Sequence, residues 1–389
     1  MADLAREAAA RPRLIVMGAQ RKLEGRDTPL AQRIEERIAR DGLISVADYM
    51  EACLADTRAG YYRTRQPIGA KGDFVTAPEI SQIFGELLGL WAVAVWQAMG
   101  EPSPIVVAEL GPGRGTLMAD ALRACRSVPK FLESVTMALV ETSPSLRETQ
   151  RASLSGSPAP LHWYQSIDDL PEGPLILIAN EFIDALPVRQ FVRKGGVWRE
   201  RCVAIDRNGK FVFAPGEAVE DGNLPEAALA VDAPDGAIFE TRPAVSPPLA
   251  ALAARAAIAP VTALFIDYGH EQTGFGDTLQ AVSRHKYADP LAAPGEIDLT
   301  AHVDFAELKR SATALGFATY GPIPQGEFLL KLGLEARRDR LLREARPDQR
   351  EAIMSGAARL ADPRAMGVLF KVLALASCGL ASPPPFGEI

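Results

Sequence analysis

The sequence predicts an α/β protein whose core is a doubly wound, mostly parallel sheet, and three observations lead to this expectation. From residue 104 onward, short apolar runs typical of buried strands alternate with helical segments. A glycine-rich turn at residues 111–115 joins one such run to a helix. The chain has 389 residues, more than one hydrophobic core usually supports, so we expect a large domain with attached elements or two domains.

The N-terminal part of the chain, residues 1–100, is predicted to be a helical cap. Helices are expected over Pro29–Arg40, Ser45–Ala55 and Glu79–Met99. The first has a proline in its first turn, and the last is apolar around most of its circumference, as in a buried helix. Asp56–Asp73 is expected to be a loop.

The core is predicted to comprise residues 101–188 and 255–380. Its expected strands are Ile105–Glu109, Val135–Val140, Leu161–Tyr164, Leu175–Ala179, Val261–Ile266, Phe317–Tyr320 and Leu369–Ala376. Its expected helices are Thr116–Arg126, Leu146–Leu154, Phe328–Arg343 and Arg350–Leu360. The tail Ser382–Phe386 contains three prolines and is expected to be loose.

An inserted β element interrupts this alternation at residues 189–254. Arg189–Val192, Val197–Ile205 and Lys210–Phe213 are separated by glycine-containing turns, which is the pattern of β-hairpins. The insertion is longer than a usual connection between strand and helix, and we expect it to form a lobe on the substrate side.

Composition excludes several classes of function. The formal net charge of −7 argues against a nucleic-acid-binding surface. The four cysteines are far apart and the histidines scattered, so neither a disulfide framework nor a metal site is expected. No apolar run approaches the ~20 residues of a membrane span, so the chain should not be an integral membrane protein. Its basic, alanine-rich start is typical of a transit peptide, but Asp3 and Glu7 favour a bacterial cytoplasmic protein, with the mitochondrial matrix as the alternative.

The turn Glu109–Gly115 carries the strongest local signal. Glycines after a strand allow a tight turn and let a ligand approach the main chain, with helix N–H groups facing it. In the dinucleotide-binding pattern the third glycine comes one residue later, where this chain has Thr116. Glu109 would repel a pyrophosphate but would attract the ammonium group of a methionine moiety. The turn therefore favours S-adenosylmethionine over a dinucleotide.

Acidic residues follow the next two strands. Glu141 ends the second strand, where an acid usually binds ribose hydroxyls. Asp168 follows the third strand, beside an apolar residue, where an adenine ring and its amino group could lie. Each acid alone could be a solvated loop carboxylate, but acids at three successive strand ends make that interpretation weaker.

The fourth strand ends in Asn180 and Glu181. Because the carboxyl ends of parallel strands line the ligand crevice, these residues should face the reacting centre. Methyl transfer needs groups that orient the acceptor, and the Glu181 carboxylate suits a guanidinium. The alternative is that Glu181 caps a helix beginning near Asp184.

Four segments of the chain resemble the MidA family of S-adenosylmethionine-dependent methyltransferases. They are 72–81, Glu109–Gly115, Asn180–Val188 and Asp298–Phe305. The resemblance runs from about Thr28 to Ala376. It implies a class I, Rossmann-like methyltransferase with a seven-stranded sheet, and arginine N-methylation of a protein subunit of respiratory complex I.

The resemblance also implies roles for particular residues. Those expected to bind S-adenosyl-L-methionine are Thr76, Ser81, Glu109, Gly111, Gly113, Gly115, Glu141 and Asp168. Asn180 and Glu181 would face the acceptor, in a stretch reading Asn-Glu-Phe-Ile. Enzymes acting on glutamine or adenine nitrogens often have Asn-Pro-Pro-Tyr there, so those acceptors are disfavoured. The alternatives are a small-molecule methyltransferase, an assembly chaperone that uses the cofactor only for stability, and a dehydrogenase.

Overall fold

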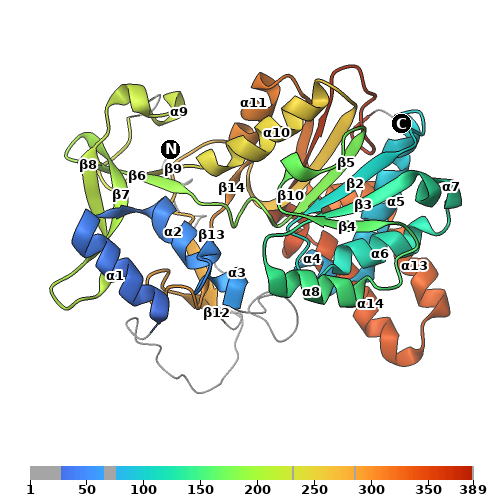
Figure 1. Cartoon of the computed structure of the whole chain (residues 1–389), viewed down its shortest axis with the longest axis horizontal. Helices are drawn as coiled ribbons and strands as arrows, with labels where there is room; N and C mark the ends of the chain where they lie inside the picture. Colours follow the sequence, from blue (N-terminus) through green and yellow to red (C-terminus); the bar gives the residue numbers. More distant parts are fainter. Residues whose placement is uncertain (1–27, 65–75, 230–231, 284–285, 388–389) are drawn as a thin grey trace.

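The computed structural model describes residues 28–64, 76–229, 232–283 and 286–387 (Figure 1). The basic N-terminal segment and residues 72–75 of the first resembling stretch lie outside the described residues. The described chain forms two lobes. The larger is a sheet covered by helices on both faces, and the smaller combines N-terminal helices with shorter strands.

The large sheet is the predicted one. Its strands are β2 (Ile105–Leu110), β3 (Val135–Val140), β4 (Leu161–Tyr164), β5 (Leu175–Asn180), β10 (Val261–His270), β15 (Ala318–Pro324) and β16 (Phe370–Ala376). They are ordered β15-β16-β10-β5-β2-β3-β4, with the short β14 (Val303–Asp304) beside β10. Neighbours from β10 to β4 run parallel, whereas β16 is antiparallel to both β10 and β15. The expected α/β class with a seven-stranded, mostly parallel sheet is confirmed.

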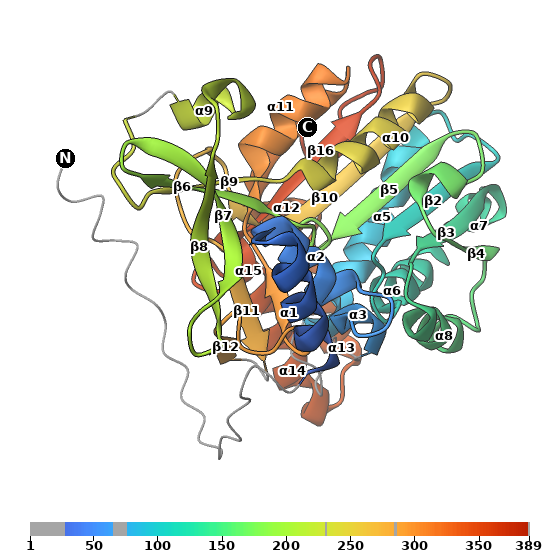
Figure 2. The same ribbon diagram turned by 60° about the vertical axis from the view of Figure 1, so that its left-hand side comes forward.

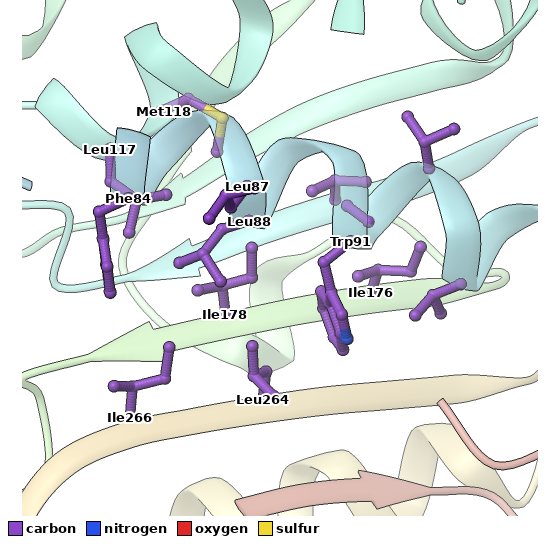
Figure 3. Close-up of a cluster of buried hydrophobic side chains, with 14 of the residues drawn as sticks. Phe84, Leu87, Leu88, Trp91, Leu117, Met118, Ile176, Ile178, Leu264 and Ile266 are labelled. Atoms are coloured by element: carbon purple, nitrogen blue, oxygen red, sulfur yellow. The ribbon is translucent and has the colours of Figure 1, made fainter. Parts of the chain in front are cut away.

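One face of the sheet is covered by the helices that flank the glycine turn and by the C-terminal helices. These are α5 (Gln82–Ala98), α6 (Thr116–Cys125), α7 (Pro129–Ser134), α8 (Pro144–Ser153), α12 (Gln325–Lys331), α13 (Leu334–Glu344), α14 (Pro347–Ala361) and α15 (Met366–Leu369). In Figure 3, Phe84 and Trp91 of α5 lie over Ile176 and Ile178 of β5. Helices α5 and α6 approach closely because Gly89 has no side chain: a Cβ there would lie 2.6 Å from a backbone oxygen of α6.

The opposite face is covered by α10 (Ser246–Ala256) and α11 (Phe305–Ala314). Leu249 and Leu252 of α10 and Phe305 of α11 are buried against apolar residues of the sheet. The sheet is therefore the middle layer of three, and its strand ends remain open at one edge.

The smaller lobe gathers three separate segments of the chain. Its elements are α1 (Pro29–Asp41), β1 (Ile44–Ser45), α2 (Val46–Ala55), α3 (Tyr61–Thr64), β6 (Arg189–Lys194), β7 (Val197–Ile205), β8 (Phe211–Ala218), α9 (Glu226–Leu229), β9 (Ile238–Thr241), β11 (Gln280–Ser283), β12 (Lys286–Ala288) and β13 (Asp298–Thr300). Ile44 pairs with Val203 of the insertion, and Figure 2 shows α1 and α2 beside β7. Strands β11–β13 pair with each other and not with the large sheet, although they fall within the 255–380 segment.

Three local expectations differ from the structure. The helix expected over Glu79–Met99 is interrupted, because Ser81 is extended and its hydroxyl caps α5; α4 (Ala77–Ile80) precedes it. The helix expected over Phe328–Arg343 is divided at Gly333, which has φ +94°. The tail is not loose: the Trp91 indole donates a 2.7 Å hydrogen bond to the Pro384 carbonyl, and the Phe386 ring packs on α12.

Candidate active site

The carboxyl ends of β2, β3 and β5 meet the smaller lobe around a cavity of about 330 Å³. The residues that line it are Glu51, Leu54, Ala55, Tyr62, Arg63, Thr76, Gly111, Gly113, Glu141, Thr142, Ser143, Leu146, Glu181, Phe182, Asp184, Ala185, Leu186, Pro187, Asp298 and Thr300. A parallel sheet offers its ligand crevice at this edge. The cavity thus joins the glycine turn to the loop that follows β5.

The glycine turn adopts a backbone that other residues rarely tolerate. Gly111, Gly113 and Gly115 have φ values of +59°, +53° and +80°. A Cβ on Gly111 would lie 3.1 Å from the Phe182 ring, so the turn and the β5 loop touch here. Gly111 and Gly113 line the cavity, whereas Gly115 packs against α8 at the start of α6.

Glu141 occupies the end of β3 with its carboxylate already oriented. One oxygen accepts a 2.7 Å hydrogen bond from the Ser143 N–H, and the other a 3.3 Å bond from the Gln150 amide. Gln150 also donates to the Gly113 carbonyl at 2.8 Å, which links the acid to the glycine turn. Burial raises the pKa of Glu141, and the Ser143 and Gln150 bonds oppose that shift. A carboxylate has about four acceptor sites, and the Thr142 N–H also interacts with this one, so at least one site remains for a hydroxyl group of a ligand.

Glu109 and Asn180 present buried acceptor atoms that lack partners among the described residues. Glu109 pairs in register with Ile178, so its side chain and that of Asn180 project from the same face of neighbouring strands. The Glu109 Oε2 and Asn180 Oδ1 atoms are buried without a hydrogen-bond partner. Burial raises the pKa of Glu109 to about 8. A cationic donor placed here would satisfy both atoms and favour the ionised carboxylate.

Glu181 lines the cavity with its backbone in a strained conformation. Its φ of +48° is in the left-handed region that non-glycine residues seldom adopt. Its Oε1 accepts from the Ala77 N–H at 2.9 Å and from the Asn180 amide at 3.2 Å. Burial raises the pKa of Glu181 to about 7, and the nearby Asp184 carboxylate contributes. Glu181 therefore caps α4; no helix begins at Asp184, so that alternative is wrong.

The loop after Glu181 is fixed from two sides. The Asp267 carboxylate accepts from the N–H groups of Ile183 and Asp184 at 2.9 and 3.1 Å. The Arg242 guanidinium donates to the Ile183 carbonyl at 2.7 Å and to the Ala301 carbonyl at 2.9 Å. Burial lowers the pKa of Arg242, and the Asp267 carboxylate opposes this shift. The strained backbone of Glu181 is thus held by buried, charge-assisted bonds.

The predicted site residues do not all converge on the cavity. Glu141, Glu181, Gly111, Gly113 and Thr76 line it. Five others are not part of the lining: Glu109 and Asn180 are buried in the neighbouring strands β2 and β5, Ser81 caps α5, Gly115 faces α8, and Asp168 is exposed on the 3-10 turn Ile167–Asp169. Their roles remain predictions without support from the cavity wall.

Residues of the smaller lobe complete the wall of the site cavity. The hydrophobic periodicity of the sequence alone could not identify them. Asp298 of β13 accepts a 3.1 Å hydrogen bond from the Tyr62 hydroxyl, and Glu51 of α2 stands nearby on the same wall. Asp184, on the β5 loop, is buried beside Tyr268. Asp184 and Asp298 both lie within the stretches that resemble the MidA family. This resemblance was the signal in the sequence that could have identified them.

Comparison with known proteins identifies the family. A family model described as S-adenosyl-L-methionine-dependent methyltransferase matches residues 87–323. The chain belongs to this methyltransferase family. It is 37% identical over 379 residues to the human mitochondrial protein arginine methyltransferase NDUFAF7, covering 90% of this chain and 83% of that protein. It is 36% identical to the Drosophila melanogaster mitochondrial homologue, over 92% of this chain and 87% of that one.

A solved structure agrees with this assignment. A Burkholderia thailandensis protein bound to S-adenosyl-homocysteine superposes with a TM-score of 0.76 at 30% sequence identity, covering 91% of this chain and 92% of the other. The cofactor of the methyltransferase is S-adenosyl-L-methionine, as expected from the glycine turn, and the dehydrogenase alternative is wrong. No helix among the described residues is long and apolar enough to cross a bilayer.

Proposed function

We propose that this methyltransferase transfers methyl groups to arginine side chains of a protein. One observation carries the proposal: among the described residues that line the site cavity, five are acids and one is basic. The acids are Glu51, Glu141, Glu181, Asp184 and Asp298, and the base is Arg63. A cavity rich in carboxylates recognises a guanidinium through charge-assisted, bidentate bonds. The names of the human and Drosophila relatives support the same acceptor class.

The chain offers groups for the methionine and ribose parts of the cofactor. We assign the ammonium of the methionine part to Glu109 and Asn180, whose buried acceptor atoms have no partner among the described residues. We assign the ribose hydroxyls to Glu141 and the close main-chain approach to Gly111 and Gly113. When bound, S-adenosyl-L-methionine supplies the methyl group.

Glu181 is assigned to the acceptor. Two hydrogen bonds to Oε1 fix the position of the carboxylate, and neither of them involves Oε2. With a pKa of about 7, the group can bind a guanidinium as a carboxylate and can take up a proton released from the reacting nitrogen. Asn180 keeps the carboxylate in place, so it acts as a positioning residue.

The acceptor protein is assigned by resemblance. We propose a subunit of respiratory complex I, as the MidA resemblance implies, and we assign the whole insertion to recognition of that protein. The relatives are named as mitochondrial proteins, so this chain works in the mitochondrial matrix or in its bacterial equivalent, the cytoplasm.

Methyl transfer to defined acceptors tests the proposal. The chain is incubated with labelled S-adenosyl-L-methionine and purified complex I subunits, and labelled residues are identified by mass spectrometry. Methylarginine that depends on Glu181 supports the proposal. Methylation only of small molecules, or of other side chains, would overturn it. Normal complex I assembly in cells that carry only the Glu181→Gln variant would favour the chaperone alternative.

A further inference from the structure

A second and larger cavity, of about 550 Å³, lies between the insertion and the helical layer of the core. One wall comes from Pro225, Ala227 and Phe239 of the insertion. The other comes from the segments after β10 and from α11, including Phe275 and Leu308. None of the described residues that line the methyl-transfer cavity also lines this one.

Packed aromatic rings give the second cavity an apolar wall. The Phe275 ring is 36% exposed, stacks on Trp198 with centroids 5.8 Å apart and meets the Phe239 ring edge-on at 5.8 Å. An aromatic face held rigidly by two other rings can accept a further ring at little entropic cost.

The polar groups of the same wall are largely paired within the chain. Glu240 accepts from the Gln190 amide at 2.6 Å and from the Thr278 N–H at 3.0 Å. The His270 ring nitrogen Nδ1 is 2.7 Å from the Gln272 carbonyl oxygen. An apolar occupant would leave the bonds of Glu240 and His270 in place, although the buried Arg242 Nε on the same wall has no partner among the described residues.

The second cavity shares a wall with the methyl-transfer site. Ile183 and Val188 line it, while residues 184–187 between them line the site cavity. Arg242, also on its wall, donates to the Ile183 and Ala301 carbonyls and so ties the shared loop to the segment between β13 and β14. The same loop thus contributes to both cavities, and an acceptor that reaches Glu181 lies beside a loop that also lines the second cavity.

We propose that this cavity is the docking site for an aromatic side chain of the acceptor protein, several residues away from the arginine that is methylated. The inference rests on the proposed function and extends it, because it names the second feature that the acceptor must carry. Charge favours a basic segment around that side chain, since Asp304, Glu307 and Glu240 line the cavity and Arg242 is the one lysine or arginine among the described residues of its wall.

Synthetic peptides test the docking site. The probes are basic peptides of about 20 residues with one arginine and one phenylalanine, at spacings from about two to ten residues, or roughly 7–33 Å at 3.3 Å per residue. Each has a matched peptide with alanine in place of phenylalanine. Binding to the full chain with S-adenosyl-homocysteine is measured by fluorescence anisotropy, and methyl transfer by mass spectrometry.

The variant Ser311→Trp fills the cavity from α11, where Ser311 lines it and is partly exposed. Phe275→Ala removes the aromatic face, and Ile258→Ala, at a residue 79% exposed and absent from both cavities, is the control. Melting temperatures and S-adenosyl-homocysteine affinity verify that each variant is folded.

At one or more spacings the phenylalanine peptide should bind wild type about 10-fold more tightly than its alanine match. Ser311→Trp and Phe275→Ala should remove that difference while the alanine peptide binds as before, and KM should change while kcat does not. Equal binding of both peptides at every spacing, or a phenylalanine effect that survives in both variants, overturns the docking site. Binding that follows this pattern without any methylarginine would instead refute the proposed acceptor class, so the two failures are distinct.

Discussion

Replacing Glu109 by glutamine tests how the methyltransferase holds its cofactor. The change keeps the shape of the side chain but removes the charge. Losing one charge-assisted bond to an ammonium costs about 1.5–3 kcal/mol, so cofactor affinity should fall by roughly 10- to 150-fold. Because the acid has a pKa of about 8 in the folded chain, it is mostly protonated near pH 6.5 before the ligand binds.

Binding of an ammonium at pH 6.5 should therefore expel the proton of Glu109. Calorimetric titration with S-adenosyl-homocysteine in two buffers of different ionisation enthalpy should give a release of roughly 0.3–0.8 proton per ligand for wild type, because a coupling of about 1.5–3 kcal/mol lowers the Glu109 pKa by about one to two units. The Glu109→Gln variant should release almost none. Glu133→Gln, at an exposed acid of α7 outside the cavity, is the matched control and should behave as wild type.

The same acid makes the stability of the ligand-free chain depend on pH. Its pKa is raised from 4.5 to about 8 on folding, so between these values the folded chain holds a proton that the unfolded chain has lost. The contribution is fully present below pH 4.5 and is lost as the pH rises through 8. At 1.36 kcal/mol per tenfold change in proton affinity, the loss is at most roughly 5 kcal/mol.

Three results would refute this reasoning for Glu109. They are an unchanged cofactor affinity in the glutamine variant, no proton release in wild type, and equal loss of melting temperature in both chains between pH 6 and pH 9. Between pH 6 and the folded pKa of about 8, roughly 2.7 kcal/mol of this contribution is lost. On the expected outcome, the wild-type melting temperature falls further than that of the variant by about 3 °C, because an unfolding entropy of about 2.1 cal/mol/K per residue over 389 residues gives roughly 1.2 °C per kcal/mol. Saturating cofactor should remove most of that difference, because the ammonium neutralises the acid.

Four further substitutions give expected outcomes. Glu181→Gln should lower methyl transfer by orders of magnitude with unchanged cofactor affinity, and the wild-type rise of the rate with pH through about 7 should disappear in a pH–rate profile. Glu141→Ala should weaken cofactor binding roughly 10- to 150-fold by calorimetry, and an effect below about twofold would remove it from the ribose site. Gly113→Val should abolish cofactor binding in a chain that still folds, because φ is +53° there; unaltered affinity would contradict this. Gly89→Ala should destabilise the chain by about 1–3 kcal/mol in urea unfolding, since the added Cβ meets Ala121 at 2.6 Å.

The sequence predicted the central strands of the sheet well because β2, β5, β10 and β16 are buried along almost their whole length. Strand β3 matches its predicted limits, Val135–Val140, and the less buried edge strand β4 matches Leu161–Tyr164. Strands β11–β13 were not predicted. They are three or four residues long, and their stability comes from packing on the N-terminal helices, which no local pattern reveals.

Some site residues could be placed at the cavity from the sequence, and others could not. Glu141 and Glu181 could be placed because strand ends of a parallel sheet converge wherever the strands are known. Asp168 follows the edge strand β4, where the turn carries it to the surface, so the same rule did not bring it to the cavity wall. Tyr62 and Asp298 are separated by 236 residues, and only the packing of the smaller lobe brings them together.

Buried polar atoms without hydrogen-bond partners connect the fold to cofactor binding. Gln150, equally buried, has both ends of its amide satisfied, by Trp163 and by the Gly113 carbonyl. Glu109 and Asn180, on neighbouring strands, each keep a buried acceptor without a partner among the described residues, and the next residue, Glu181, has a left-handed backbone. An unmet buried acceptor costs about 1–3 kcal/mol, and a strained backbone costs a similar amount. The ligand-free chain carries these costs at one sheet edge, so a cation that satisfies the acceptors recovers part of them as affinity.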